Sequence, residues 1–351
     1  MFQRQWHSPG SQIGLEDHSI KHEYSLIKHD YRNAISNIDK YCNSSQNKYW
    51  TRQKSRLKHI LSRKTDCINI SFEGFWPDFN CIDNQILDFI RLAVIDKNLQ
   101  INIIPSSPDT DINFSSCYGQ YLVLPSNATQ ILFLGENVRP NFLNFDYSAG
   151  FDQFTSCNRI IYMPLWLFEI DLFNKSYDDR NPLQKKIFHS EQSVDFSKRK
   201  DAVAFIGNNA EPFREYFLNQ LIDFGFQVDR FGSHTNPVGN KFDLLKNYKY
   251  SLCFENSFHP GYVTEKLPHS LISGCISLYF GCLTNEPFAN HPLIFNVSSS
   301  MDIRKSMLEI KEFGSKFFDI YSSPSIASKN QINNLCFKIV DSLRSILQIY
   351  S

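Results

Sequence analysis

The sequence lacks several motifs that mark common enzyme classes. It has no C-x-x-C pair, so neither a zinc knuckle nor a dithiol redox site is indicated. Its nine cysteines are dispersed and odd in number, which favours free, mostly buried thiols in a reducing compartment. There is no H-E-x-x-H, no G-x-S-x-G, no P-loop and no dinucleotide fingerprint. Zinc-dependent hydrolysis, acyl transfer and hydride transfer are therefore disfavoured.

Long hydrophobic runs and a net charge are also missing. The N-terminus, MFQRQWHSPG, has no apolar signal core, and the longest near-apolar runs are IIYMPLWLFEI and LISGCISLYFGCL. Both runs are well short of the ~20 residues that a membrane-spanning helix needs. The formal net charge is zero, so nothing global attracts nucleic acid. We expect a cytoplasmic protein with no nucleic-acid partner, whose membrane contact, where there is any, is peripheral.

What is present is typical of a large globular protein. The 351 residues are 42% hydrophobic, with 31 phenylalanines, and suffice for two domains. Residues 1–66 are polar and are predicted to form a helical extension. Within it, residues 50–64 predict a basic helix with an apolar side, for which a peripheral membrane or partner contact is one interpretation. A solvated helix that packs on the domain is the favoured alternative, because charge runs usually only solvate.

Strand and helix patterns alternate twice along the rest of the chain, which predicts parallel sheets covered by helices. A polar stretch at about 170–200 separates the two series. We expect one α/β domain over 67–185, a second over 186–330, an amphipathic helix over 331–351, and a cleft between the domains. The expected strands lie at 67–75, 99–105, 130–135, 201–207, 226–232, 248–254 and 275–281, and the expected helices at 81–94, 211–225, 242–248 and 264–274.

Two junctions from strand to helix in the second series share an uncommon feature. The helix after DAVAFIG carries Arg214 in its first turn, and the helix after YKYSLCF carries Lys266 there. A cation at this place opposes the helix dipole, which makes sense where an anion also binds. The alternatives are an ion pair of Arg214 with Glu211 and a plain surface lysine. Both cations at equivalent junctions favour a diphosphate site.

The stretch CFENSFHPGYVTEK, which follows one of these strands, is rich in polar groups. Asn256 offers donors and an acceptor, Tyr262 a hydroxyl, and Glu265 a carboxylate able to accept from two sugar hydroxyls. Glu255 lies next to the strand end, where it either faces the ligand or turns inward to fix the loop. These residue types suit a nucleotide sugar without naming one.

Three segments carry a resemblance to a known family. FENSFHPGYVTEK, followed by a strand that ends in LYFG, closely resembles the signature of the α-1,3-fucosyltransferases, glycosyltransferase family 10. AFIGNNAEPFR and LFLGENVRPNF…FDYSAGFD resemble two further segments of that family, and together the likeness covers roughly residues 67–300. The resemblance implies a GT-B fold, in which two Rossmann-like domains face a central cleft, with the acceptor on the first and GDP-L-fucose on the second.

Residue roles follow from the resemblance. It implies that Glu136 is the general base of an inverting transfer and that Arg214 and Lys266 neutralise the diphosphate. The residues that would hold the nucleotide sugar are Asn208, Asn256, Tyr262 and Glu265. It implies no obligatory metal or other cofactor, with Mg²⁺ or Mn²⁺ at most stimulatory. One departure is Gly207, where the family has a serine. From the residues alone, Glu136 follows an apolar strand and either faces the cleft or is a solvent-facing loop glutamate.

The leading hypothesis is therefore transfer of L-fucose from GDP-L-fucose to an oligosaccharide or glycoconjugate acceptor, at O3 of a GlcNAc-type residue. One alternative is the same fold acting with another GDP-sugar or acceptor in surface-polysaccharide synthesis. A hypothesis of another class is a catalytically inactive glycan-binding homologue. Substitution of Glu136 separates the enzyme from the binding protein, because only the enzyme loses turnover.

Overall fold

The computed structural model describes the following residues: 48–63, 66–97, 99–119, 127–140, 142–153, 157–169, 195–207, 212–232, 236–298, 303–310 and 329–350. These residues fall into two compact units. Unit 1 comprises residues up to 133 together with 138–148 and 340–351, and unit 2 comprises 134–137 and 149–339. Within the described ranges, none of the helices is both long and apolar enough to span a bilayer.

A six-stranded sheet has the order β2-β1-β3-β4-β5-β6, and its strands β1 to β4 belong to unit 1. Strands β1, β2, β3 and β4 pair in parallel. The strand bounds are β1 Cys67–Glu73, β2 Gln100–Ile103, β3 Ile112–Ser116, β4 Thr129–Phe133, β5 Tyr147–Gly150 and β6 Ile160–Tyr162. The strands expected at 67–75, 99–105 and 130–135 are confirmed, whereas β3, β5 and β6 were not predicted as strands.

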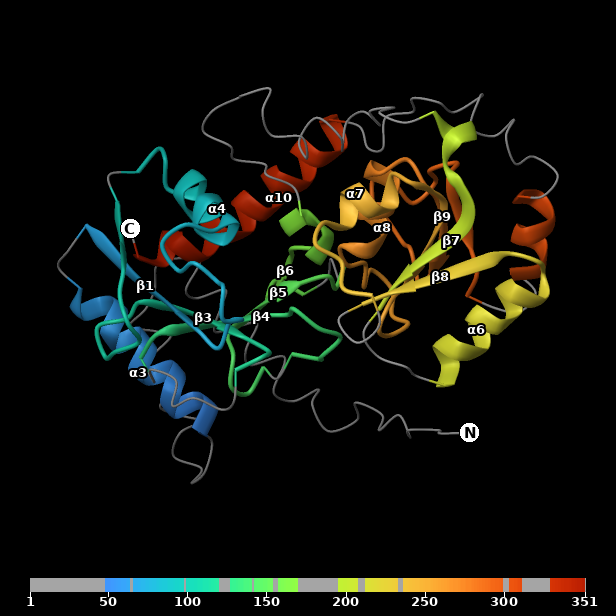
Figure 1. Cartoon of the computed structure of the whole chain (residues 1–351). Helices are drawn as coiled ribbons and strands as arrows, with labels where there is room; N and C mark the ends of the chain where they lie inside the picture. The colour runs from blue at the N-terminus through green and yellow to red at the C-terminus, as the bar shows by residue number, and fades with distance from the viewer. Residues whose placement is uncertain are drawn as a thin grey trace. The chain divides into compact units, whose positions relative to one another are not determined.

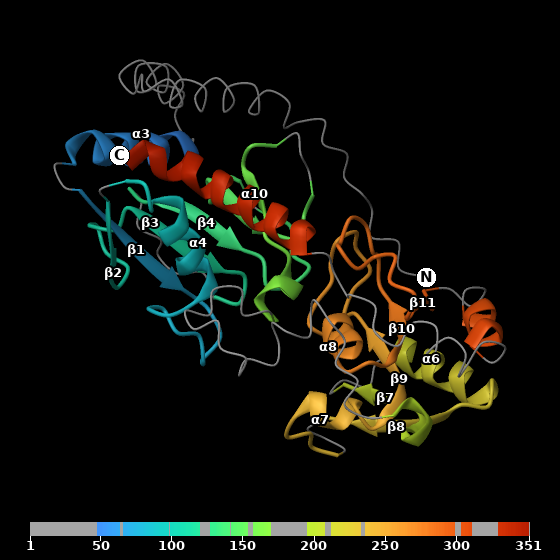
Figure 2. The same ribbon diagram turned by 90° about the horizontal axis from the view of Figure 1, so that it is seen from above.

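Two helices lie together on one face of this sheet (Figures 1 and 2). The first, α4 (Gln85–Ala93), begins after Asn84, whose side-chain oxygen accepts a hydrogen bond from the Leu87 amide at 2.9 Å. The second, α10 (Lys329–Leu347), contacts it through Arg344, whose Nε lies 3.4 Å from the Ala93 carbonyl oxygen. The apolar stripe of α10 is buried, as its helical spacing predicts.

The basic helix α3 (Lys48–Ser62) packs on unit 1, as the favoured interpretation has it. Arg52 makes a bidentate pair with Asp146 at 2.7 and 2.8 Å, and Arg56 approaches the same carboxylate at 3.1 Å. Burial would raise the pKa of Asp146, but the two guanidinium groups outweigh it and hold that pKa well below its usual range. These arginines therefore serve the fold, and nothing in their arrangement supports a membrane contact.

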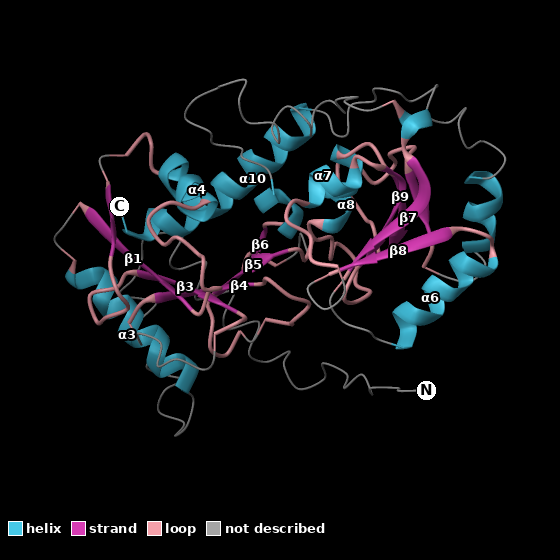
Figure 3. Cartoon of the chain, viewed as in Figure 1, coloured by secondary structure: helices cyan, strands magenta, loops and turns pink. Residues whose placement is uncertain are grey.

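Unit 2 holds a five-stranded sheet in the order β11-β10-β9-β7-β8, in which every pair is parallel. Helix α6 lies on one face, and α7 and α8 lie on the other (Figures 2 and 3). The bounds are β7 Lys200–Ile206, α6 Pro212–Asp223, β8 Gln227–Phe231, α7 Lys241–Leu245, β9 Tyr248–Phe254, α8 Lys266–Ile272, β10 Ile276–Phe280 and β11 Ile294–Asn296. All of these were predicted except β11.

Chain order and unit membership differ at residues 134–137 and again at residues 340–351, which return to unit 1. Residues Leu134–Asn137 directly follow β4 of the first sheet, yet they pack with unit 2. Leu134 donates its amide to the Ala149 carbonyl at 2.9 Å, and its side chain fills the space where a Cβ on Gly150 would lie. Glu136 therefore belongs to the unit that also contains the FENSFHPGYVTEK segment.

Candidate functional site

Glu255 is the anchor of the segment between β9 and α8. It is fully buried, and its carboxylate accepts hydrogen bonds from the Thr264 amide at 2.9 Å and the Thr264 hydroxyl at 2.7 Å. Burial raises the pKa of Glu255 despite the opposing influence of Lys266 and of the Thr264 bonds. Glu255 thus turns inward and closes the loop, which is one of the two orientations that the sequence left open.

Lys266, the first residue of α8, is held by the same anchor. Its Nζ lies 2.9 Å from the Thr264 hydroxyl and 3.4 Å from Glu255 Oε2, while its side chain keeps 22% exposure. An ammonium group fixed in this way has little rotamer entropy left to lose when an anion binds. The predicted phosphate cation is therefore preorganised at the carboxyl end of β9.

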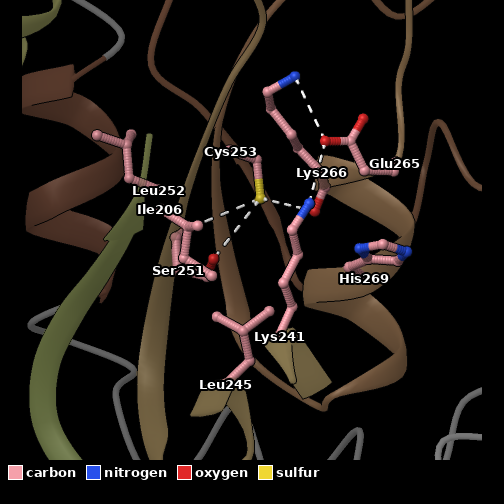
Figure 4. A pocket seen from close by; sticks show the side chains of 9 residues that line it. All are labelled: Ile206, Lys241, Leu245, Ser251, Leu252, Cys253, Glu265, Lys266 and His269. Atoms are coloured by element: carbon pink, nitrogen blue, oxygen red, sulfur yellow. Dashed lines mark hydrogen bonds and ion pairs between the residues drawn. The ribbon is translucent and has the colours of Figure 1, made fainter. Parts of the chain in front are cut away.

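Glu265 precedes Lys266 and stands between two lysines. Its Oε1 lies 3.4 Å from Lys241 Nζ and 3.8 Å from Lys266 Nζ, and Figure 4 shows the three side chains together. Burial would raise the pKa of Glu265, but Lys266 and Lys241 outweigh it and lower that pKa. The ionised carboxylate is a suitable acceptor for sugar hydroxyls.

A small pocket of about 30 Å³ opens beside these charges, between the ends of two strands and helices α7 and α8. Figure 4 shows its lining residues, which are Ile206, Lys241, Leu245, Ser251, Leu252, Cys253, Glu265, Lys266 and His269. Space of that size suits a water molecule rather than a nucleotide.

Arg214 and Asn256 meet from the two junctions that the sequence singled out. Arg214 lies in the first turn of α6, is 6% exposed, and donates from Nη2 to Asn256 Oδ1 at 2.7 Å. Its guanidinium stands 5.6 Å from the centre of the Phe254 ring, within reach of a cation–π contact. This contact joins the junction after β7 to the junction after β9, whereas the role of both residues in donor binding stays a prediction. Asn208 lies outside the described residues, as does Glu211.

Tyr262 and Glu136 form the remaining part of the site. The Tyr262 hydroxyl donates to Glu136 Oε2 at 2.6 Å, across 126 positions of sequence. The Tyr262 side chain is 1% exposed and packs edge-on against Phe151, with ring centres 5.0 Å apart. The structure thus joins two predicted site residues, Tyr262 and Glu136, by a hydrogen bond. Contact of Tyr262 with the nucleotide sugar stays a prediction.

The sequence analysis missed Lys241 and Phe151. Lys241 is the first residue of α7, directly after Asn240, whose side chain caps that helix at the Phe242 amide. A third cation at a strand-to-helix junction of the same sheet was therefore visible in NPVGNKFDLL, but the helix was placed one residue too late. Phe151 lies in the FDYSAGFD segment, but nothing in that segment predicted its contact with Tyr262, which is set by tertiary packing.

Two further observations concern the chemistry of the site. Among the residues that the structure describes, no three histidine, cysteine, aspartate or glutamate side chains are grouped in a way that would hold a metal ion. The departure at Gly207 has a local reason, since a Cβ there would lie 2.7 Å from the tip of the Phe205 ring. The aromatic ring occupies the space that the family's serine side chain would enter.

Two α/β units, each with a sheet of parallel-paired strands, are typical of the GT-B class of fold. A solved α1,3-fucosyltransferase structure superposes with a TM-score of 0.61 at 24% identity, covering 82% of this chain and 93% of that one. A second structure, of an α1,3-fucosyltransferase with GDP-fucose, gives a TM-score of 0.56 at 23% identity over 80% of this chain and 92% of that one. These likenesses establish the fold.

The family follows from the sequence comparisons. Residues 68–169 match the model of the α-(1,3)-fucosyltransferase FucT N-terminal domain, and residues 196–290 match the C-terminal model of glycosyltransferase family 10 (fucosyltransferase). Together the two matches cover more than half of the chain, which belongs to glycosyltransferase family 10. The α-(1,3)-fucosyltransferase FucT of Helicobacter pylori is 26% identical over 261 residues, which is 65% of this chain. The alignment spans 53% of that relative, about half its length.

Proposed function

We infer that this protein is an inverting fucosyltransferase, which moves L-fucose from GDP-L-fucose to a hydroxyl of a glycan acceptor. Membership of family 10 supports the donor, since the related structures include an α1,3-fucosyltransferase with GDP-fucose. The residues that carry the inference all lie in unit 2; they are Glu136, the cations Arg214, Lys241 and Lys266, and the polar loop that follows β9. We propose O3 of a GlcNAc-type residue as the acceptor position.

The single observation that carries the proposal is the hydrogen bond from Tyr262 to Glu136. It ties the candidate base to the FENSFHPGYVTEK segment, which also supplies the phosphate cation Lys266. A transferase needs a base near the sugar carbon and a cation near the leaving phosphate at the same time. A protein that only binds glycans would not require a carboxylate tied to a phosphate-binding loop.

The chemistry follows from these roles. Glu136 takes the proton of the acceptor hydroxyl while the oxygen of that hydroxyl attacks C1 of fucose. The bond between C1 and the phosphate oxygen breaks, and GDP departs with the bonding electrons. Lys266 and Arg214 stabilise the charge that grows on the diphosphate. Attack from the face opposite GDP converts a β-linked donor sugar into an α-linked product.

The remaining contacts hold the donor. Glu265 accepts from sugar hydroxyls, Asn256 provides donors and an acceptor, and Asn208 is expected to join them. The two fixed cations take the place of the charge that a metal ion would otherwise supply. We therefore propose that Mg²⁺ or Mn²⁺ is at most stimulatory, so that a chelator reduces the rate only modestly.

The test is release of GDP from GDP-L-fucose, GDP-mannose and UDP-galactose, with and without N-acetyllactosamine. We expect release from GDP-L-fucose that depends on the acceptor and falls by about 100-fold or more in Glu136→Gln. GDP binding should persist in that variant. Equal release from GDP-mannose would support the alternative donor instead. Turnover that is absent from every pair, with glycan binding intact in wild type and variant, would support the inactive homologue.

A further inference from the structure

The Tyr262 side chain is fixed on all sides. Its ring is 1% exposed and meets the Phe151 ring edge-on, at an angle of 66° between the ring planes. Its hydroxyl donates a hydrogen bond to Oε2 of Glu136 at 2.6 Å. A tyrosine buried to this degree presents almost no surface to a ligand from solution.

The backbone around Tyr262 is equally constrained. Gly261 has φ +77°, a conformation that residues with a Cβ rarely adopt. A Cβ at Gly261 would also lie 2.7 Å from the Phe151 carbonyl oxygen. The Gly261 amide donates to the Cys282 carbonyl at 3.1 Å, and the Tyr262 amide donates to the His259 carbonyl at 3.0 Å. The position of the Tyr262 hydroxyl is thereby set by the fold and not by the ligand.

The same segment leads directly to the phosphate cation. Thr264, two residues after Tyr262, is bound by Glu255 through both its amide and its hydroxyl. That hydroxyl in turn accepts from Lys266 Nζ at 2.9 Å. One short stretch of chain therefore fixes a carboxylate at one end and an ammonium group at the other.

We propose that Tyr262 is a positioning residue for the base Glu136. This inference rests on the proposed function and adds a role for Tyr262 to it. A carboxylate rotates about its terminal bond, so its two oxygens exchange places unless one is held. The Tyr262 hydroxyl holds Oε2 of Glu136, and this sets the direction in which Oε1 points. Tyr262 thus acts through Glu136 on the acceptor hydroxyl, while Lys266 and Arg214 act on the diphosphate.

A double-mutant cycle of the full chain tests this. Tyr262→Phe, Glu136→Gln and the double variant are compared for kcat with GDP-L-fucose and N-acetyllactosamine, and for GDP affinity by calorimetry. We expect Tyr262→Phe alone to lower kcat by about 10-fold or more, within the range that proton transfer contributes. GDP affinity should stay within about two-fold. In the Glu136→Gln background, Tyr262→Phe should change kcat by less than about two-fold, because no base is left to position.

Tyr248→Phe is the matched control. Tyr248 is also a buried tyrosine of unit 2 that donates to a carboxylate, Asp229, at 2.7 Å, but this pair lies at the opposite end of β9. Tyr248→Phe should lower thermal stability about as much as Tyr262→Phe does, and it should leave kcat unchanged.

Two outcomes would overturn the inference. If the kcat losses of Tyr262→Phe and Glu136→Gln multiply in the double variant, Tyr262 acts independently of the base. If Tyr262→Phe weakens GDP affinity by about 10-fold, Tyr262 is a donor ligand. In both cases Glu136→Gln is impaired and the proposed function stands. If Glu136→Gln transfers fucose at the wild-type rate, the proposed base fails and the positioning role fails with it.

Discussion

Replacing Lys266 by methionine is expected to weaken GDP binding by about 10- to 150-fold. A hydrogen bond to a charged group contributes about 1.5–3 kcal/mol, and each 1.4 kcal/mol is tenfold in affinity. Lys266 should give a value in this range because it is 22% exposed and already held at 2.9 Å by Thr264. Methionine keeps an unbranched side chain that is one atom shorter, and it removes the charge and the hydrogen-bond donors.

Lys241→Met provides the comparison within the same site. Lys241 is 45% exposed and pairs with Glu265 at 3.4 Å. Exposed ion pairs contribute about 0.2–1 kcal/mol, so its loss should weaken GDP binding by no more than about six-fold. Calorimetric titration of GDP at low and high salt measures both variants. Salt should diminish the contribution of Lys241 more than that of Lys266, since exposed charges are screened more strongly.

Loss of fold must be separated from loss of binding. Lys266→Met removes the cation nearest to the buried Glu255, but burial already raises the pKa of Glu255. The Thr264 amide and hydroxyl still bind the Glu255 carboxylate in the variant, and thermal melting of both lysine variants checks that the fold persists. A change in GDP affinity below about three-fold, or one equal to that of Lys241→Met, would refute the phosphate role of Lys266.

Two further predictions concern the loop and the other unit. Gly261→Ala should lower kcat by about 10-fold or more and cost at least 1–2 kcal/mol of stability, because alanine is strained at φ +77° and meets Phe151. Gly239→Ala, where an added Cβ has no neighbour within 4 Å, should have little effect on kcat or on unfolding by urea. Asp146→Asn should cost about 3–5 kcal/mol, because it leaves the buried Arg56 poorly paired, while GDP affinity stays unchanged. Since the folded-state pKa of Asp146 is lowered, its contribution is present above the unfolded value of about 3.9 and is lost as pH falls below it. The free energies of unfolding of wild type and Asp146→Asn, measured in urea, should therefore converge as the pH is lowered below about 3.9. A difference that does not change with pH would contradict the stabilising role of ionised Asp146.

Much of the fold could be predicted because its signals are local. The strands around the site carry continuous apolar runs, and the helices after them begin at recognisable residues such as Pro212. Strands β3 and β5 escaped prediction because INFSS and YSAG mix small and polar residues, although the structure buries them completely. Their identity as strands is decided by the neighbours that cover them.

The same distinction between local and tertiary signals applies to the site residues. Arg214 and Lys266 could be found because their positions within helices follow from nearby residues. The bond between Tyr262 and Glu136 could not, since it joins positions 126 apart and depends on where Phe151 packs. The inward orientation of Glu255 was only one of two alternatives until the Thr264 contacts decided it.

The membership of Leu134–Asn137 in unit 2 bears on how this protein could be recombined. A chimera joined in the linear interval between the two matched segments, after residue 169 and before residue 196, would take Tyr262 from one parent and Glu136 from the other. The carboxylate and the tyrosine would then have evolved in different proteins. A chimera that keeps Glu136 and Tyr262 from the same parent has to transfer residues 134–137 together with the rest of unit 2. These four residues would then be inserted into the first half of the other parent.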